Sequence, residues 1–347
     1  MLSAVPVAAL DPTDPDSGAV AHYGDPSREQ RTLDTAAGVV DRSHRTVLAV
    51  PGADRLSWLH SLTTQHLTGL PAMSGTELLV LSPHGHVEHH AVVTDDGTTT
   101  WLDLEPGDGL LDFLTRMRFM MRVEPADVTA GWALLSVVGP EAGDVTGSLL
   151  PPDVLAVPGP KFATGAVPAR PTVRYAVAPG FDGWVRRMSY GADLLVPRAA
   201  VPDVIATLGL PPAGIWAFEA MRVAARRPRF GFETDHKTLP AEVGWTAPAV
   251  HLEKGCYRGQ ETVSRVHHLG RPPRKLVLLH LDGIATDELP ARHTPVLSAE
   301  GRTVGFVGTA ARHHELGMVA LAVVKQNINP DSVLQVGPST AAMDPTT

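Results

Sequence analysis

One stretch of the sequence concentrates a thiol, two cations, an amide and a carboxylate around two glycines: Lys254-Gly255-Cys256-Tyr257-Arg258-Gly259-Gln260-Glu261-Thr262. The glycines allow the backbone to approach another surface closely, because glycine has no Cβ. The residues that follow could open a helix or a strand. If they open a helix, Cys256 lies just before an N-terminus, where backbone N–H groups stabilise a thiolate.

Cys256 is the only cysteine of the chain, and its residue type permits two interpretations. The flanking cations Lys254 and Arg258 favour the thiolate, which is the reactive and metal-binding form. A lone cysteine is also commonly a small buried apolar group that serves packing alone. The charged, glycine-bracketed surroundings favour the reactive thiol.

The motif Lys-Gly-Cys-Tyr-x-Gly-Gln-Glu resembles the signature of the YgfZ family. These are folate-binding proteins tied to iron–sulfur cluster assembly or repair, and they are related in fold to GcvT, the aminomethyltransferase (T-protein) of the glycine cleavage system. Further segments carry the same resemblance, so that it covers most of the chain from about Arg31 onward: 55–67, 81–85, 217–231 and 265–272.

The resemblance implies an α+β, GcvT/T-protein-like fold: two ferredoxin-like α+β domains and a small C-terminal β-barrel around a central folate channel. The implied division is a flexible N-terminal arm (1–28), a first ferredoxin-like domain (29–130), a second (131–250), a signature loop (251–270) and a C-terminal β-barrel domain (271–347).

Patterns in the chain agree with this division. Residues 46–50 predict a strand and 54–62 a short helix, and a helical pattern of Leu and Met runs from 110 to 121. The run 48–54 is similar to the run 135–141, which indicates a repeat about 87 residues apart. After Arg271 the sequence changes to short alternating strands, typical of a small barrel.

The resemblance also implies the site residues. Cys256 is expected to be the redox or cluster-contacting group, with Lys254 and Arg258 as its activators. Folate-binding residues are expected in the signature region and in the helix before it: Tyr257, Gln260, Glu261, Arg265, Glu219 and Arg222. The implied cofactor is tetrahydrofolate or a one-carbon derivative, with a transient iron–sulfur cluster whose other ligands come from a partner.

Two positions depart from the T-protein pattern. Ala224 stands where many relatives have an acidic residue able to pair with the pterin edge, and Glu219, one turn earlier, is the candidate substitute. Neither Asp103 nor Asp108 falls at the spacing expected for the aspartate that T-proteins use in aminomethyl transfer. The second departure weakens the transferase hypothesis.

Composition excludes several classes of protein. A net charge of −8 argues against sequence-independent binding of nucleic acid, and one cysteine excludes a metal site built from two or four cysteines of this chain. The histidines at 84, 86, 89 and 90 predict a solvated hairpin, since their side chains point to different faces of a strand. We therefore expect no resident metal. The absence of a long apolar run and of a secretory signal predicts a cytoplasmic protein without membrane contact.

The main hypothesis is a folate-binding YgfZ-like accessory protein in iron–sulfur cluster assembly or repair, and through it in tRNA modification. Its partners would be folate and iron–sulfur client enzymes or assembly factors, without direct sequence-specific nucleic-acid binding. The alternative is a folate-dependent aminomethyl or methyl transferase related to T-protein. A third hypothesis is a non-catalytic module that binds a partner protein.

Overall fold

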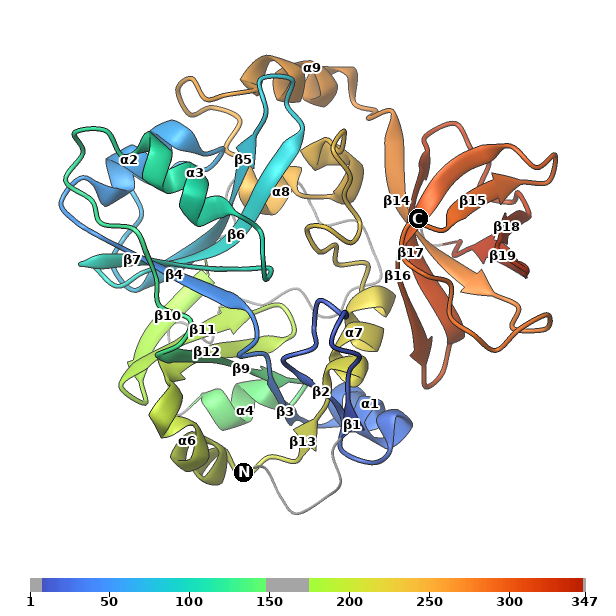
Figure 1. Cartoon of the computed structure of the whole chain (residues 1–347), viewed down its shortest axis with the longest axis horizontal. Helices are drawn as coiled ribbons and strands as arrows, with labels where there is room; N and C mark the ends of the chain where they lie inside the picture. The colour runs from blue at the N-terminus through green and yellow to red at the C-terminus, as the bar shows by residue number, and fades with distance from the viewer. Residues whose placement is uncertain (1–7, 148–174, 346–347) are drawn as a thin grey trace.

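The computed structural model describes residues 8–147 and 175–345. Figure 1 shows a large sheet body with its helices beside a separate barrel, and α7 (Ile215–Ala224) lies between them. The sheet has eleven strands in the order β13-β3-β9-β12-β11-β10-β5-β6-β7-β4-β8. The fold is α+β with a closed C-terminal barrel, as the sequence predicts.

The first half of the sheet body follows the order strand, helix, three strands, helix, strand. Its elements are β4 (Thr46–Pro51), α2 (Arg55–Leu62), β5 (Ser74–Leu81), β6 (Val87–Asp95), β7 (Thr99–Leu104), α3 (Leu110–Met117) and β8 (Ala126–Asp127). Leucines and valines from the strands and both helices form one buried cluster, including Leu48, Leu59 and Leu114. This cluster fixes α2 and α3 on the sheet.

The second half repeats the same order of elements. They are β9 (Trp132–Val138), α4 (Ala142–Thr146), β10 (Tyr175–Gly180), β11 (Gly183–Met188), β12 (Gly191–Pro197), η1 (Arg198–Ala200), α6 (Val201–Leu208) and β13 (Pro212–Ala213). Strand β3 (Gly38–Asp41) is inserted between β9 and β13. Strands β4 and β9, which carry the similar sequence runs, occupy equivalent places in the two halves. Each run is followed by a Ser-Leu pair, at Ser61-Leu62 and at Ser148-Leu149, and the second pair lies outside the described residues.

A short seam joins the halves. β10 pairs with β5 through Tyr175 opposite Gly75 and Ala176 opposite Ser74. The sequence predicts a strand over 172–177, of which residues 172–174 lie outside the described residues. The seam makes one continuous sheet, so residues from both halves can line one central site.

The C-terminal strands close into a barrel, as predicted. It consists of β14 (Arg274–Leu281), β15 (Pro295–Ser298), β16 (Thr303–His313), β17 (Gly317–Lys325), β18 (Leu334–Val336) and β19 (Ser339–Met343). Alternate residues of these strands, such as Val277, Ala320 and Val336, fill the barrel interior. The short strand β19 was not predicted from the sequence.

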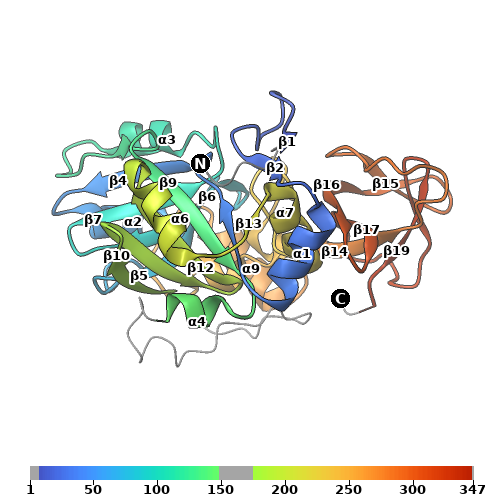
Figure 2. The same ribbon diagram turned by 90° about the horizontal axis from the view of Figure 1, so that it is seen from below.

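The N-terminal arm differs from the expectation of a flexible segment over 1–28. Its described part forms β1 (Ala8–Ala9) and β2 (Val20–His22), and α1 (Pro26–Thr35) begins within it. Asp16 on this arm is buried. Its carboxylate pairs with Arg229, so that the arm is fixed on the body by buried charge. Figure 2 shows α1 and α7 side by side between the sheet and the barrel.

Two further segments refine the sequence prediction. Helix α3 ends at Met117, earlier than the predicted helical run to 121, because Phe119 adopts a left-handed φ of 43° that a continuing helix excludes. The signature opens a helix rather than a strand: α9 (Gln260–Leu269), which follows η2 (Pro240–Val243) and α8 (Thr246–Ala249).

No helix in the described ranges is long and apolar enough to cross a lipid bilayer.

Candidate functional site

A cavity of about 350 Å³ lies where the sheet body meets α7 and the loop that follows it. Its wall is rich in cationic side chains, with carboxylates and aromatic rings among them. The charged lining residues are Arg42, His44, Arg45, Glu77, His90, Asp103, Glu105, Asp193, Glu219, Arg222, Arg226, Arg227 and Arg229. A buried site of this polarity must pair its charges internally or with a ligand.

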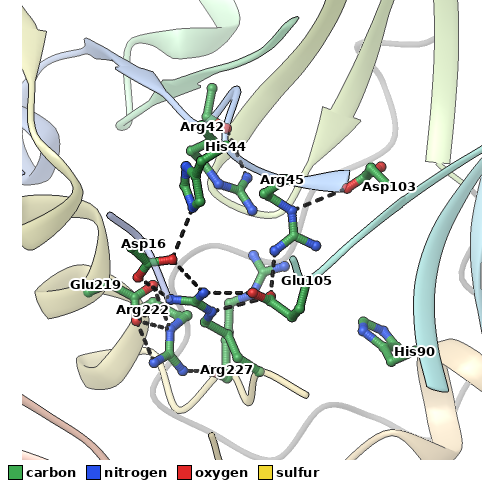
Figure 3. A network of polar contacts seen from close by, with 12 residues as sticks. Asp16, Arg42, His44, Arg45, His90, Asp103, Glu105, Glu219, Arg222 and Arg227 are labelled. Carbon is green, nitrogen blue, oxygen red and sulfur yellow. Dashed lines mark hydrogen bonds and ion pairs between the residues drawn. The ribbon is translucent and has the colours of Figure 1, made fainter. Parts of the chain in front are cut away.

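Arg229 is the centre of a charge network, and its carboxylate partners Asp16, Glu105 and Glu219 are labelled in Figure 3. Its guanidinium pairs with Asp16 at 2.8 Å, with Glu105 at 2.6 Å and with Glu219 at 3.1 Å. These carboxylates come from the N-terminal arm, from the residue that follows β7, and from α7. One arginine therefore ties together three segments that are distant in sequence.

The carboxylates of this network are held ionised. Burial alone would raise the pKa of Glu105, but the guanidinium groups of Arg229 and Arg45 hold it well below its usual range. Burial would likewise raise the pKa of Asp16, and Arg229 and His44 lower it. Neither carboxylate acts as a proton donor at neutral pH.

A second buried cluster of charged residues is centred on Arg186. Arg186 is fully buried and pairs with Asp103 at 2.7 Å and with Asp193 at 2.9 Å. Asp193 also accepts hydrogen bonds from Ser136 and Tyr190, at 2.6 and 2.7 Å. Asp103 and Asp193, on the sheet side of the cavity, are thus paired with arginines.

A third group carries aromatic surface into the cavity. His90 stacks on Trp245, with ring centroids 4.4 Å apart and an interplanar angle of 11°, and its Nε2 lies 2.8 Å from Glu77. The hydroxyl of Tyr175 donates to the same carboxylate. Burial would raise the pKa of Glu77, but its hydrogen bond with His90 outweighs this and the pKa falls to about 2. This part of the wall combines a flat aromatic face with a fixed carboxylate.

Arg227 differs from the other arginines of the lining. Its guanidinium donates to the Ser189 hydroxyl and lies over the Tyr190 ring, 4.7 Å from the centroid. Within the part of the chain that the structure describes, no carboxylate lies within 4 Å of it, whereas the other five lining arginines each have one. Its positive charge is available to a ligand.

The signature segment lies elsewhere, at the end of the molecule where α9 packs near β5 and β6 (Figure 1). Cys256 is exposed, so the packing interpretation of this cysteine is wrong. The Lys254 ammonium is buried and donates to backbone carbonyls at the end of α2, including those of Thr63 at 2.5 Å and Gln65 at 3.2 Å. Burial lowers its pKa to about 8. Lys254 anchors the segment.

A glycine holds this segment against the β5–β6 hairpin. Gly259 has φ +81°, and a Cβ there would lie 2.7 Å from Gly85 Cα and from the Ser82 carbonyl oxygen. Arg258 pairs with Glu88 of the hairpin at 3.1 Å. The close approach of the backbone to another surface, expected from the glycines of the signature, is therefore observed at Gly259.

The comparisons with known proteins agree with this architecture. A family model described as the GcvT N-terminal domain matches residues 22–194. Aminomethyltransferases of Moorella thermoacetica and Rubrobacter xylanophilus are 26% and 27% identical, each over 87% of this chain and 82% and 80% of their own lengths. The glycine cleavage system aminomethyltransferase T of Bartonella henselae superposes with a TM-score of 0.74 at 16% identity, over 95% of this chain and 91% of that one.

The chain belongs to the GcvT-like superfamily.

A further relative is an Arabidopsis thaliana protein named "Putative transferase At1g60990, chloroplastic". It is 24% identical over 84% of this chain, which spans 65% of its length.

Within this GcvT-like chain, the predicted site residues divide between two places. Glu219 and Arg222 line the cavity and pair with each other at 2.7 Å. The signature residues do not reach it: among the described residues, the cavity lining contains none from 254–265. Tyr257 is buried beside Lys254. The side-chain amide of Gln260 contacts the Lys254 carbonyl.

Glu261 and Arg265 form an exposed i, i+4 ion pair on α9, at 2.9 Å. They line a shallow surface hollow together with Gln260, Ser264 and His268. This GcvT-like chain therefore presents its expected folate ligands at two separate surfaces.

Sequence reasoning missed most of the cavity wall. No motif surrounds Arg42 or Glu105 in the sequence. Arg227 stands in the charged run Arg226-Arg227-Pro228-Arg229, within the segment 217–231 that carries the family resemblance, and nothing in the run itself indicates a cavity. Asp108, one of the two aspartates considered for transfer, instead lies 2.6 Å from His89 and accepts from the Leu110 amide at the start of α3.

Proposed function

We propose that this chain binds a tetrahydrofolate in the cavity between the sheet body and α7. A folate combines a flat, polar ring system with a dicarboxylate tail. The stacked His90 and Trp245 offer a flat face for the first part, and Arg227 on the arginine-rich wall offers a cation for the second. The observation that carries the proposal is the Arg227 guanidinium, which faces the cavity without a carboxylate partner among the described residues.

Calorimetric titration of the purified chain with tetrahydrofolate tests this proposal. Arg227→Met should weaken binding at least tenfold, because a charge-assisted hydrogen bond contributes roughly 1.5–3 kcal/mol. Arg265→Met is the matched control, since it removes a cation predicted for folate from the exposed face of α9. If Arg265→Met weakens binding and Arg227→Met does not, the folate binds at α9 and the cavity proposal fails.

For the activity, we propose folate-dependent one-carbon transfer as the first candidate. Its support is the set of aminomethyltransferases that resemble this chain over most of their length. Asp103 is the candidate carboxylate nearest the cavity, although two arginines share it. Purified protein with an N-methyl or aminomethyl donor and tetrahydrofolate should release a one-carbon folate, and Asp103→Asn should abolish release while folate binding is retained.

The second candidate is the YgfZ-like role in iron–sulfur cluster assembly or repair. It is favoured by the exposed Cys256 on a loop that buried Lys254 and close-packed Gly259 hold in place. In cells lacking the gene, wild type should restore a cluster-dependent enzyme under oxidative stress, and Cys256→Ser should not. Equal rescue by both proteins would refute a role for the thiol. The segment around Arg258 would then be a partner-binding surface, and charge reversal at Arg258 should disrupt binding of the partner.

A further inference from the structure

A histidine and two carboxylates meet where α1 reaches the barrel. Asp34 lies in the last turn of α1, and His314 and Glu315 form the turn between β16 and β17. Each offers one potential ligand atom, and the three atoms lie within 4.8 Å of one another. Two elements separated by about 280 residues in sequence thus bring metal-binding side chains together, and none of the three residues lines the cavity beside α7.

The histidine of this group is placed as a ligand would be. The side chain of His314 is 5% exposed, and its Nε2 lies 3.5 Å from Asp34 Oδ2. That buried nitrogen has no hydrogen-bond partner in the described parts of the chain. An unsatisfied buried nitrogen is costly unless a ligand completes it.

The backbone around the group is fixed independently of any ligand. The side-chain amide of Gln30, one helical turn before Asp34, donates to the Arg312 carbonyl and accepts from the His314 amide, both at 2.8 Å. The His313 Nδ1 accepts from the amides of Glu315 and Leu316, at 3.2 Å each. The turn is therefore positioned against α1 before a metal binds.

We propose that Asp34, His314 and Glu315 bind one divalent first-row metal ion, such as Zn²⁺ or Mn²⁺. Two carboxylates balance the charge of the ion and suit manganese, and a neutral imidazole suits zinc and iron. Three protein ligands leave positions for water. The ion would link α1 to the barrel and stabilise the junction between the two bodies.

Titration of the full-length, chelator-treated chain with Zn²⁺ in a calorimeter tests this site. We expect one equivalent to bind, and Asp34→Asn and Glu315→Gln each to weaken binding at least tenfold; both residues are exposed, so the fold should tolerate the changes. Glu288→Gln, an exposed carboxylate elsewhere in the barrel domain, should leave binding unchanged. Cys256→Ser should also leave it unchanged.

A second measurement separates this site from other zinc ligands. Zn²⁺ should raise the melting temperature of the wild type, because it binds only the folded junction, and should not raise that of Asp34→Asn. Binding of equal strength by wild type and by the Asp34→Asn, Glu315→Gln double variant overturns the proposal. So does loss of the zinc equivalent in Cys256→Ser, or no zinc binding below about 1 mM in the wild type.

Discussion

Arg229 in the cavity wall and Arg265 on the exposed face of α9 differ in their surroundings. Arg229 has 8% of its side chain exposed and pairs with three carboxylates. Arg265 is 65% exposed and pairs with one, Glu261, which is 87% exposed. Charges withdrawn from water must be paired, whereas exposed charges remain solvated and free to exchange partners. Arg229 therefore holds the structure together, and Arg265 is available to a partner.

The largest effect is expected from Arg229→Met. The substitution leaves Asp16, Glu105 and Glu219 buried without their shared cation, and breaking a buried ion pair by removing one partner costs about 3–5 kcal/mol of unfolding free energy. Urea denaturation of wild type and variant measures the difference. A loss below about 1 kcal/mol would show that the carboxylates find water or another cation.

A smaller effect that depends on pH is expected at Glu77. Its folded pKa is about 2 against the ordinary value of 4.5, so at pH 3 the unfolded chain binds a proton that the folded chain does not. The unfolding free energy therefore increases by about 3 kcal/mol as the pH rises from 2 to 4.5, and this stability is lost as the pH falls through the same window. Glu77→Gln should remove this component of the pH dependence of unfolding, measured between pH 2.5 and 6. Exposed Glu261→Gln serves as control, and an identical change in both variants would contradict the assignment.

Gly259→Ala should destabilise the signature segment by about 2 kcal/mol, because strain from the positive φ adds to the close approach to Gly85 and Ser82. Gly270→Ala provides the control: its φ is +71°, but a Cβ there meets nothing within 4 Å. The difference in melting temperature between the two variants isolates the steric part. Equal melting temperatures would mean that the β5–β6 hairpin moves aside at no cost.

The smallest effect is expected from Arg265→Met. The exposed ion pair with Glu261 contributes about 0.3–0.5 kcal/mol, so the unfolding free energy should change by no more than this. The same urea experiment used for Arg229 measures it. A loss comparable to that of Arg229→Met would remove the distinction between the two regions.

Much of the fold follows from the sequence because its signals are local. The alternating strands after Arg271 predict the barrel, and the similar runs at 48–54 and 135–141 predict the repeated halves of the sheet. The early end of α3 could not be read in the same way. Met121 continues the apolar spacing, and only the left-handed backbone at Phe119 stops the helix.

The cavity and the proposed metal group were beyond local reasoning. Asp16 looks like part of a polar tail and Arg229 like part of a loop, and neither predicts the other. His313-His314 is an adjacent pair of the kind that usually has no role, and its relation to Asp34 exists only once α1 packs beside the barrel. Signals that arise from contacts between distant segments have no periodicity by which a single sequence could reveal them.

The buried bond between Asp16 and Arg229 also has a consequence for the order of events during synthesis. The two residues are 213 positions apart, so the arm leaves the ribosome long before its partner exists. Until then the Asp16 carboxylate stays in water. The cavity is complete only after α7 and the loop that carries Arg229 have emerged, which places its assembly in the last third of translation.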